Sequence, residues 1–570
     1  MNKIHHVMDW ISRHKWGIIV TLVALIVRTW NIDKFPMEFT PDEAALGYNA
    51  YSLIKTGHDE NGQFFPIIFK SFGDYKPGLY IYLTIPWILI GDLTISMVRM
   101  TSAISGTLAV FFTYIILRLI KNELPYAFLK KRLPIYGALI LALNPWHILF
   151  SRGAWESNVN LTMILFSIVC VLYAVKRGYS HMIVLAGLIS GLTLSMYQGA
   201  KMSTPLVGLA FIIAYYQSIK RRLSLGYVIL ALLVAIAVSM PIAQSFLDGR
   251  TGRLSVFSIL NYQRPSEYIQ ENILTPTNWT NNDWQFKIFE GEWLEKTRNV
   301  YQRYGSALSP RFLFIEGDWE HSHMATPYHG MFYWLDSIFL IIGILTAIRI
   351  QSRFWRFVLI WLLLAPLPAA LSRDPVNAVR SLPLIAPLTM LIGLGYCQTI
   401  RLIKLNYPKL YYPSIAVFII IQLILFTYFA DLQTKVRPMK LSFNNYFGYQ
   451  QLVEATKKYS SQNIPIVMSQ SYDQPYIYFL FFNKIDPVFT QNNINRIDNE
   501  YGDVGLVSSV GQNFQFRDIY WDADKMTKNT VFIGNPVTTI HPSSSDEKMY
   551  DVSEIKAPSG ESIFRIVYTI

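Results

Sequence analysis

The chain has 570 residues, of which 52% are hydrophobic and only 15% are charged, and its net charge is +12. This composition is too apolar for a soluble globular protein. Most Lys and Arg residues lie in short clusters between apolar segments, where such clusters set membrane topology and contact anionic headgroups, so the charge does not indicate a nucleic-acid partner. The two cysteines, Cys170 and Cys397, lie inside apolar segments, which favours packing over a disulfide or a Cys-based metal site.

The apolar residues form separate segments long enough to cross about 30 Å of hydrocarbon as helices. A polytopic α-helical membrane protein is therefore predicted, and its basic amino terminus leads into a retained first span because no small-residue cleavage site follows. We predict about eleven transmembrane helices, over Trp16–Trp30, Met97–Leu119, Ile135–Phe150, Val159–Val175, Met182–Met196, Thr204–Tyr216, Leu225–Phe246, Phe332–Ile348, Phe357–Leu371, Leu382–Cys397 and Tyr412–Phe429.

Basic clusters orient these helices. With a cytoplasmic amino terminus, all of the clusters fall on the cytoplasmic side, as the positive-inside rule requires. They are Arg118–Arg132, Lys176–Arg177, Lys220–Arg222, Arg349–Arg356 and Arg401–Lys409. The apolar segment Leu79–Ile90 is short and contains Pro86, and counting it as a span would place every cluster outside. We expect it to be a juxtamembrane helix or re-entrant segment at the outer surface.

This topology divides the chain into a transmembrane module, residues 1–430, and an extracytoplasmic tail, residues 431–570. The module carries two large outer segments, residues 31–96 and 247–330. The tail is polar enough to be soluble, and its mixture of elements predicts a small α/β domain. These elements are an amphipathic helix over Tyr449–Tyr459 and β-like runs over Ile464–Met468, Tyr476–Phe482, Thr530–Ile533 and Phe564–Ile570.

The first outer segment holds the residues that indicate chemistry. Thr40-Pro41-Asp42-Glu43 presents two adjacent carboxylates, and Lys76 follows in Phe72-Gly73-Asp74-Tyr75-Lys76-Pro77. An acid pair and a lysine at a membrane surface suit a reaction between a lipid-linked phosphate and a nucleophile that must lose a proton. Pro and acidic residues are also typical of a helix amino terminus, and the two interpretations are compatible because such a terminus is a rigid mount for a base.

Cations lie at the predicted outer ends of several spans, where positive charge is unexpected: Arg28, Arg99, Arg152, Lys201, Arg373 and Arg380. Together with Lys76 they could bind a phosphate, although each could instead reach headgroups or pair with a nearby acid, as Arg373 is expected to do with Asp374. His321, His323 and His329 match no standard zinc spacing, and no glycine-rich nucleotide motif occurs. We therefore predict no cofactor, while a divalent metal stays possible.

The order of these motifs resembles the GT-C membrane glycosyltransferases. The likeness rests on the Asp42-Glu43 pair, the Lys76-Pro77 segment, Val98–Ala103 opening the next span, and Asn144–His147 followed by Ser151–Glu156. It covers roughly residues 15 to 400 and is greatest to family 39, which contains protein O-mannosyltransferases and the aminoarabinose transferases of lipid A. Gly78 follows Lys76-Pro77 where relatives often have a second proline, which leaves the lysine in place.

The resemblance implies a multi-pass enzyme of the cytoplasmic membrane that takes a sugar from a polyprenyl-phosphate donor and passes it to a protein, lipid or glycan acceptor outside. It implies a metal-independent, inverting transfer with Asp42 as general base and Glu43 beside it to orient the acceptor or hold a cation. Lys76 would contact the donor phosphate. Arg28, Arg99, Arg152, Lys201 and Arg380 are the other candidate phosphate ligands.

Two other classes of function stay open. A transporter or flippase of a lipid-linked sugar would place polar residues deep within several spans, whereas here the charges gather near span ends. A lipid-linked glycan ligase or polymerase would share the outer-face chemistry and use a different donor.

Overall fold

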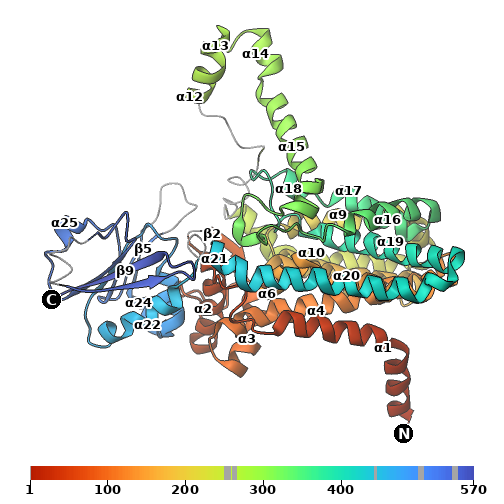
Figure 1. The fold of residues 1–570 in the computed structure, drawn as a ribbon, viewed down its shortest axis with the longest axis horizontal. Helices are drawn as coiled ribbons and strands as arrows, with labels where there is room; N and C mark the ends of the chain where they lie inside the picture. Colours follow the sequence, from red (N-terminus) through yellow and green to blue (C-terminus); the bar gives the residue numbers. More distant parts are fainter. Residues whose placement is uncertain are drawn as a thin grey trace.

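The computed structural model describes residues 2–72, 74–248, 259, 266–441, 446–497, 506–541 and 550–570, with side chains from residue 11 onward except at position 246. Gly73 and parts of the second outer segment and of the tail therefore lie outside the described residues. Long helices form a bundle, and the C-terminal domain sits against one end of it, beside α2 (Pro41–Thr56) and α21 (Arg437–Leu441) (Figure 1). Helices α12 to α15 of the second outer segment project away from the bundle.

The bundle contains helices from the whole of the predicted transmembrane module. They are α1 (Asn2–Thr29), α4 (Ile95–Leu119), α5 (Ala127–Leu143), α6 (Pro145–Arg152), α7 (Glu156–Arg177), α8 (Met182–Leu194), α9 (Ala200–Arg222), α10 (Leu225–Leu247), α16 (Asp336–Ile350), α17 (Arg353–Leu364), α18 (Leu367–Ala370), α19 (Ile385–Asn406) and α20 (Tyr411–Asp431). The outer segments add α2 (Pro41–Thr56), β1 (Ile68–Ser71), β2 (Asp74–Pro77), α3 (Leu79–Gly91), α12 (Ser266–Ile269), α13 (Thr275–Thr277), α14 (Trp284–Phe289) and α15 (Glu292–Leu308).

Among the described residues, seven helices are long and apolar enough to cross a membrane, or eight if the bent pair α5–α6 counts as one span. The pair bends by 57° where Asn144 caps the second helix and Pro145 opens it. Helices α8 and α16 are apolar but only 13 and 15 residues long. A multi-pass helical membrane protein is thus confirmed, and the count of about eleven spans stays a prediction.

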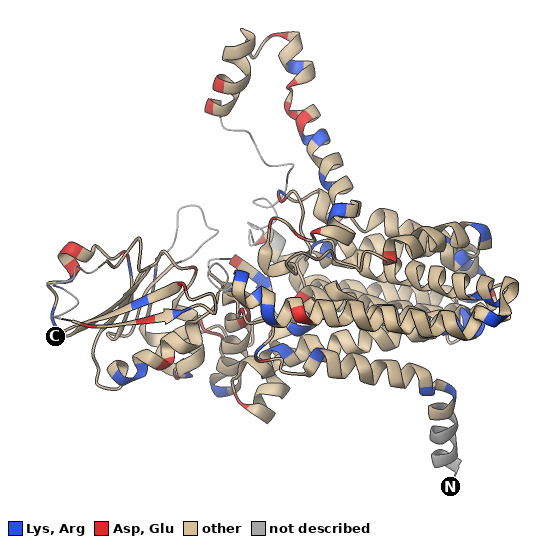
Figure 2. Ribbon diagram, viewed as in Figure 1, with Lys and Arg blue, Asp and Glu red and all other residues tan. Residues whose placement is uncertain are grey.

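The basic clusters lie together. Figure 2 shows Lys and Arg gathered at the bundle end that faces away from the C-terminal domain, where α4, α7, α9, α16 and α19 end. A second group of charges lies between the bundle and the C-terminal domain. The helix centres between the two ends carry few charges, as the hydrocarbon interior of a bilayer requires.

Close helix packing in the bundle depends on small residues. A Cβ atom on Gly343 of α16 would lie 1.9 Å from the carbonyl oxygen of Leu391, and one on Gly395 of α19 would lie 1.9 Å from that of Phe339. Glycine at both positions therefore lets the two backbones touch, the kind of contact that holds helices together where no hydrophobic force acts between them.

The described residues between 446 and 570 form the α/β domain that the sequence predicts. Its helices are α22 (Tyr449–Ser460), α23 (Tyr476–Asn483), α24 (Pro487–Asn493) and α25 (Trp521–Asp524), and its strands are β3 (Ile466–Met468), β4 (Ile494–Ile497), β5 (Leu506–Val510), β6 (Phe514–Phe516), β7 (Thr530–Gly534), β8 (Asp551–Lys556) and β9 (Ser562–Thr569). The strand order is β4-β5-β6-β3-β7-β9-β8, and β3 is parallel to both of its neighbours. Alternate side chains of β3 pack into two separate hydrophobic cores, one on each face of the sheet. Ile466 and Met468 lie in one core and Val467 lies in the other.

The prediction of a strand over Tyr476–Phe482 is wrong, because this run forms helix α23. Six of its residues are buried, so neither the twofold alternation of a strand nor the one-sided stripe of a helix marks it. The helix over Tyr449–Tyr459 and the strands near Ile466, Thr530 and Phe564 are confirmed, as is a helical Leu79–Gly91.

Helix α2 joins the C-terminal domain to the bundle. Tyr48 donates a hydrogen bond of 2.9 Å to the carbonyl oxygen of Ile485, and Tyr478 donates one of 2.8 Å to that of Phe39. A Cβ atom on Gly47 would lie 2.5 Å from Val98 of α4 and 2.6 Å from Phe481 of α23. The helix that begins with the acid pair is therefore packed on both sides.

Candidate active site

Helix α2 begins as its sequence predicts. Thr40 is the N-cap, Pro41 occupies the first helical position, and the Thr40 hydroxyl accepts a hydrogen bond of 3.2 Å from the Glu43 N–H. The Glu43 carboxylate accepts one of 3.0 Å from the Thr40 N–H, which completes a capping box. The expected helix start is confirmed, and it fixes the direction in which Asp42 leaves the chain.

Glu43 is buried and forms an ion pair with Arg99 of α4. Its Oε1 accepts hydrogen bonds of 2.8 Å from Arg99 Nε and 2.9 Å from the Ala154 N–H, and its Oε2 accepts one of 3.2 Å from Arg99 Nη2. The remaining Arg99 donors reach the carbonyl oxygens of Ile32, Pro36 and Glu38. All five N–H donors of the guanidinium are thus in use, and the pair holds the first outer segment on the bundle.

Asp42, one residue earlier, points the other way. Its carboxylate is 57% exposed and forms an ion pair with the Lys76 ammonium, which is 15% exposed. Lys76 lies on strand β2 of the β1–β2 hairpin and also sits 5.2 Å from the centre of the Phe72 ring. The structure therefore brings together the two residues, 34 positions apart, that the sequence singles out as base and phosphate ligand.

The turn between α8 and α9 supports strand β2. Gln198 donates a hydrogen bond of 2.8 Å to the carbonyl oxygen of Tyr75, and Lys201 donates one of 2.5 Å to the Gln198 side chain. The Leu79 N–H binds the carbonyl oxygen of Ser195 at 3.0 Å. Lys201 accordingly lies one side chain away from the strand that carries Lys76.

Arg28 and Arg152 tie helix ends together. Arg28 is fully buried, and its donors reach Ser151, His147 and the carbonyl oxygens of Ala24, Leu141 and Ala142. Arg152 donates to the carbonyl oxygens of Val27, Trp30, Asn31 and Phe35, at the end of α1. Arg152 therefore binds main-chain oxygens, and Arg28 binds both main-chain oxygens and two side chains.

Arg380 lies in the loop between α18 and α19. Its guanidinium pairs with Asp374 and donates a hydrogen bond of 2.7 Å to the Ser372 hydroxyl. Asp374 thus pairs with Arg380 here, whereas the sequence suggests Arg373 as its partner. The charges of Asp374 and Arg380 also act on His321, whose pKa is raised chiefly by its hydrogen bond to Asp318.

The three histidines do not converge on one point. His321 binds Asp318 at 3.2 Å, His323 stacks on Trp155 with ring centres 6.2 Å apart, and His329 packs against Tyr333 and Phe429. No group of three His, Cys, Asp or Glu side chains within the described residues has the arrangement of a metal site.

Two residues that the sequence did not indicate lie at this site, and both come from the tail. Tyr446 donates a hydrogen bond of 3.2 Å to the Asp473 carboxylate, and its ring meets that of His323 edge to face at 6.2 Å. Burial raises the pKa of Asp473, and the charges of Asp42 and Lys76 both act on it. An isolated Asp in a loop has no distinguishing sequence pattern, so only the fold reveals its position.

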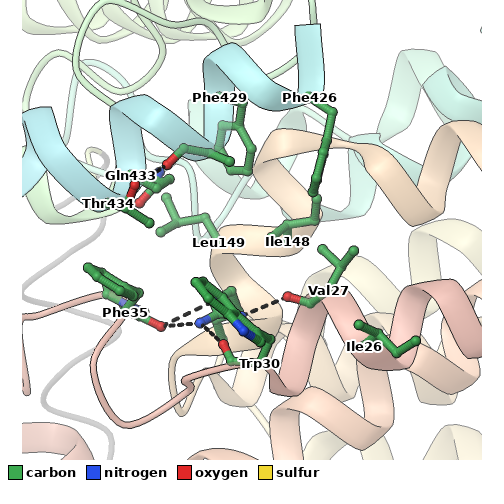
Figure 3. A pocket seen from close by; sticks show the side chains of 13 residues that line it. Ile26, Val27, Trp30, Phe35, Ile148, Leu149, Phe426, Phe429, Gln433 and Thr434 are labelled. Carbon is green, nitrogen blue, oxygen red and sulfur yellow. Dashed lines mark hydrogen bonds between the residues drawn. The ribbon is translucent and has the colours of Figure 1, made fainter. Parts of the chain in front are cut away.

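An apolar pocket of about 300 Å³ opens between α1, α6 and α20 (Figure 3). Trp30, Ile148 and Phe429 are among the side chains that line it. Phe35 and Pro36, which belong to the first outer segment, line it as well. Arg152 also borders the pocket, but its guanidinium donates its hydrogen bonds to main-chain carbonyl oxygens. The apolar pocket is therefore bordered by the same outer segment that carries Asp42.

Comparison with known proteins supports the fold. No protein-family model matches the chain, and no curated protein sequence matches it. Two crystal structures of ArnT from Cupriavidus metallidurans, in the apo state and bound to undecaprenyl phosphate, each align with a TM-score of 0.53. Identity is 13% and 12%, coverage of this chain is 98% and 97%, and coverage of ArnT is 98% in both.

An archaeal oligosaccharyltransferase, AglB from Archaeoglobus fulgidus, also aligns, with a TM-score of 0.49 in the apo form, 12% identity, and coverage of 98% of this chain and 75% of AglB. At this level of identity the likeness to ArnT is one of architecture, and it extends over nearly the whole of both chains. The chain therefore has the fold of ArnT.

Proposed function

We propose that this protein transfers a sugar from a polyprenyl-phosphate donor to an acceptor at the outer face of the cytoplasmic membrane. One observation carries the proposal: an exposed Asp42 carboxylate is paired with Lys76 at a rigid helix start, in a chain with the fold of ArnT. The ArnT structure that contains undecaprenyl phosphate supports a polyprenyl-phosphate donor.

In the proposed reaction, an acceptor hydroxyl or amine attacks the anomeric carbon of the donor sugar. The bond between that carbon and the phosphate oxygen breaks, polyprenyl phosphate leaves, and the acceptor proton passes to Asp42. A positioned base of this kind typically contributes about 10²- to 10⁴-fold. Attack from the face opposite the phosphate inverts the anomeric configuration. Asp374 and Ser372 hold Arg380 in an outer loop, and we propose Arg380 as a second phosphate ligand.

Lys76 has two successive roles in this scheme. Without a donor its ammonium neutralises Asp42, as in this structure. A donor phosphate would replace the carboxylate as its partner, which leaves Asp42 available as a base, and Lys76 would then stabilise the charge that grows on the departing phosphate. Arg28, Arg99 and Arg152 have no part in the transfer, because carbonyl and side-chain acceptors within the fold bind their guanidinium groups.

The test is transfer of radiolabelled hexose from a polyprenyl phosphate to crude membrane acceptors. We expect Asp42→Asn and Lys76→Ala each to reduce the rate at least a hundredfold. Asp92 and Lys484 form a second ion pair, whose carboxylate is 61% exposed against 57% for Asp42 and whose lysine is 39% exposed against 15% for Lys76. Asp92→Asn and Lys484→Ala are therefore the control variants and should keep full activity. Activity of Asp42→Asn within tenfold of wild type would show that Asp42 is not the base. A wild type that moves the donor across liposomes and never transfers its sugar would favour the transporter.

We also propose that the apolar pocket takes part of the donor's hydrocarbon chain, since its lining is apolar and α1, which forms one wall, leads into the segment that carries Asp42. Ala430 lines the pocket and Ile420 faces outward from the same helix, 55% exposed. Ala430→Trp should therefore raise the KM of a long-chain donor and spare that of a donor with one or two isoprene units. Ile420→Trp is the control, and an equal effect of Ala430→Trp on both donors would exclude the pocket.

A further inference from the structure

The C-terminal domain has no role in the transfer as described above, yet its Asp473 is joined through Tyr446 to Phe39, three residues before Asp42. We propose that Asp473, held by Tyr446, binds a hydroxyl group of a sugar ring in the active site, so that the C-terminal domain completes the substrate site. This inference rests on the proposed function and adds a specificity-determining residue to it.

The position of Asp473 in the sheet favours a binding role. Strand β3 lies between β6 and β7 and runs parallel to both. The later strands β6 and β7 thus lie on opposite sides of β3, which makes the carboxyl end of β3 a topological switch point. In open α/β sheets, ligands bind outside the carboxyl ends of the strands at such a switch point. Asp473 lies in the loop that leaves β3 after Met468 and enters α23 at Tyr476.

Tyr446 fixes this loop to the first outer segment. Its hydroxyl binds the Asp473 carboxylate at 3.2 Å, and its carbonyl oxygen accepts a hydrogen bond of 3.4 Å from the Phe39 N–H. Phe39 lies one residue before the N-cap of α2 and is buried against Phe481 and Phe482 of α23. Asp473 and Asp42 are therefore mounted on elements that share one core.

Charge links the loop to the proposed catalytic pair. Asp42 and Lys76 both act electrostatically on Asp473, the first disfavouring and the second favouring its ionised form. Among the described residues, no cation lies within ion-pair distance of Asp473, whereas Asp42 has Lys76 and Glu43 has Arg99. The Asp473 carboxylate keeps acceptor capacity beyond the hydrogen bond that Tyr446 donates to it.

Three aromatic side chains lie in a row next to Asp473, beginning with Tyr446, which binds it. The Tyr446 ring meets His323 edge to face, and His323 stacks on Trp155 at an interplanar angle of 13°. Burial lowers the pKa of His323 to about 4, so its imidazole is neutral at pH 7. Aromatic side chains with a few fixed polar groups line many small-ligand sites, and a carboxylate that accepts hydrogen bonds suits the hydroxyl groups of a sugar.

The experiment measures the KM of the donor and of the acceptor fraction separately for Asp473→Asn and Tyr446→Phe in the transfer assay. Tyr459 and Asp551 form a matched pair in the same domain, joined at 2.9 Å. By the strand register, Asp551 aligns with Ile466 at the amino end of β3, whereas Asp473 follows the carboxyl end of that strand. Asp551→Asn and Tyr459→Phe are therefore the controls.

We expect Asp473→Asn to raise one KM about tenfold or more, since hydrogen bonds to charged groups are the stronger ones, while kcat stays within about threefold and both controls match wild type. A higher donor KM assigns the contact to the donor sugar, and a higher acceptor KM assigns it to an acceptor sugar. Tyr446→Phe should have a smaller effect in the same direction. Unchanged KM values for both substrates in Asp473→Asn would overturn the inference and leave the proposed function intact.

Binding of undecaprenyl phosphate, which carries no sugar, separates sugar recognition from general damage. Asp473→Asn should bind this probe as wild type does, and Lys76→Ala should bind it more weakly. Equal weakening of the probe and of the glycosylated donor in Asp473→Asn would show that Asp473 does not contact a sugar. If wild type transfers nothing, the proposed function fails. Without transfer no acceptor is defined, so the inference is then limited to the donor sugar, and an unchanged ratio of donor affinity to probe affinity in Asp473→Asn overturns it.

Discussion

Glu43→Gln decides whether the second acid of the pair is structural. Four N–H donors surround the two carboxylate oxygens of Glu43, two from Arg99 and one each from Thr40 and Ala154. A glutamine amide has one acceptor oxygen, and its NH₂ group would face two of these donors in either orientation. The substitution therefore removes two hydrogen bonds and leaves the Arg99 charge buried without a counter-charge.

The magnitude follows from these losses. Breaking a buried ion pair by removal of one partner costs about 3–5 kcal/mol, because the other charge stays buried. Unfolding entropy of about 2.1 cal/mol/K per residue gives about 1.2 kcal/mol/K for a chain of 570 residues. A loss of about 4 kcal/mol should therefore lower the Tm by about 3 °C. Asp42→Asn removes an exposed charge and should change stability by no more than about 1 kcal/mol.

The assay compares Tm and transfer rate for both variants in the same detergent. We expect Glu43→Gln to lose stability and Asp42→Asn to lose activity with an unchanged Tm. Wild-type Tm for Glu43→Gln together with complete loss of transfer would refute the structural role of Glu43 and place it in the reaction. Arg99→Leu, which removes the other partner, should reproduce the Glu43→Gln loss of Tm.

Three further predictions concern stability. Burial raises the pKa of Glu60 from its ordinary value of 4.5 to about 7, so the folded chain binds this proton more tightly than the unfolded chain. Stability should therefore fall by about 3 kcal/mol between pH 4.5 and 7, and Glu60→Gln should flatten this part of the Tm profile; an equally steep profile would contradict it. Gly343→Ala should lower the Tm because its Cβ would overlap the Leu391 carbonyl, and an unchanged Tm would mean that α16 and α19 separate freely. Arg437→Leu should cost about 3–5 kcal/mol by unpairing buried Glu38, and Glu38→Leu in the same chain should recover much of that loss.

The sequence predicts the elements whose residues act locally. Helix α2 follows from Thr40, Pro41 and Glu43, because a cap and its capping box are formed by neighbours in the chain. The bundle follows from apolar segments, because a bilayer makes length and hydropathy sufficient. Helix α23 was mistaken for a strand because a fully buried apolar run has no periodicity to distinguish the two.

The binding partners of the cations cannot be predicted from residue type and position in the sequence. Arg28, Arg99, Arg152 and Arg380 stand at similar places near span ends, and the sequence treats them alike as phosphate ligands. The structure separates them: main-chain oxygens surround Arg28 and Arg152, Glu43 and three carbonyls bind Arg99, and Asp374 binds Arg380. Which group a long side chain binds depends on the segments that pack against it. The sequence of one segment does not show which other segments will pack there.

Taken by itself, the sequence determined the membrane class of the protein, the α/β character of its tail, and the choice of Asp42 and Lys76. Each of these depends on composition, periodicity or a short motif. Only the tertiary structure decided that Asp42 and Lys76 form a pair, that Glu43 is buried with Arg99, and that Asp473 is joined through Tyr446 to the segment before Asp42. Asp473 is more than 430 positions from Asp42 along the chain. Contacts of that range arise from packing between domains, because the energy that favours them belongs to the whole interface and not to the residues that meet there.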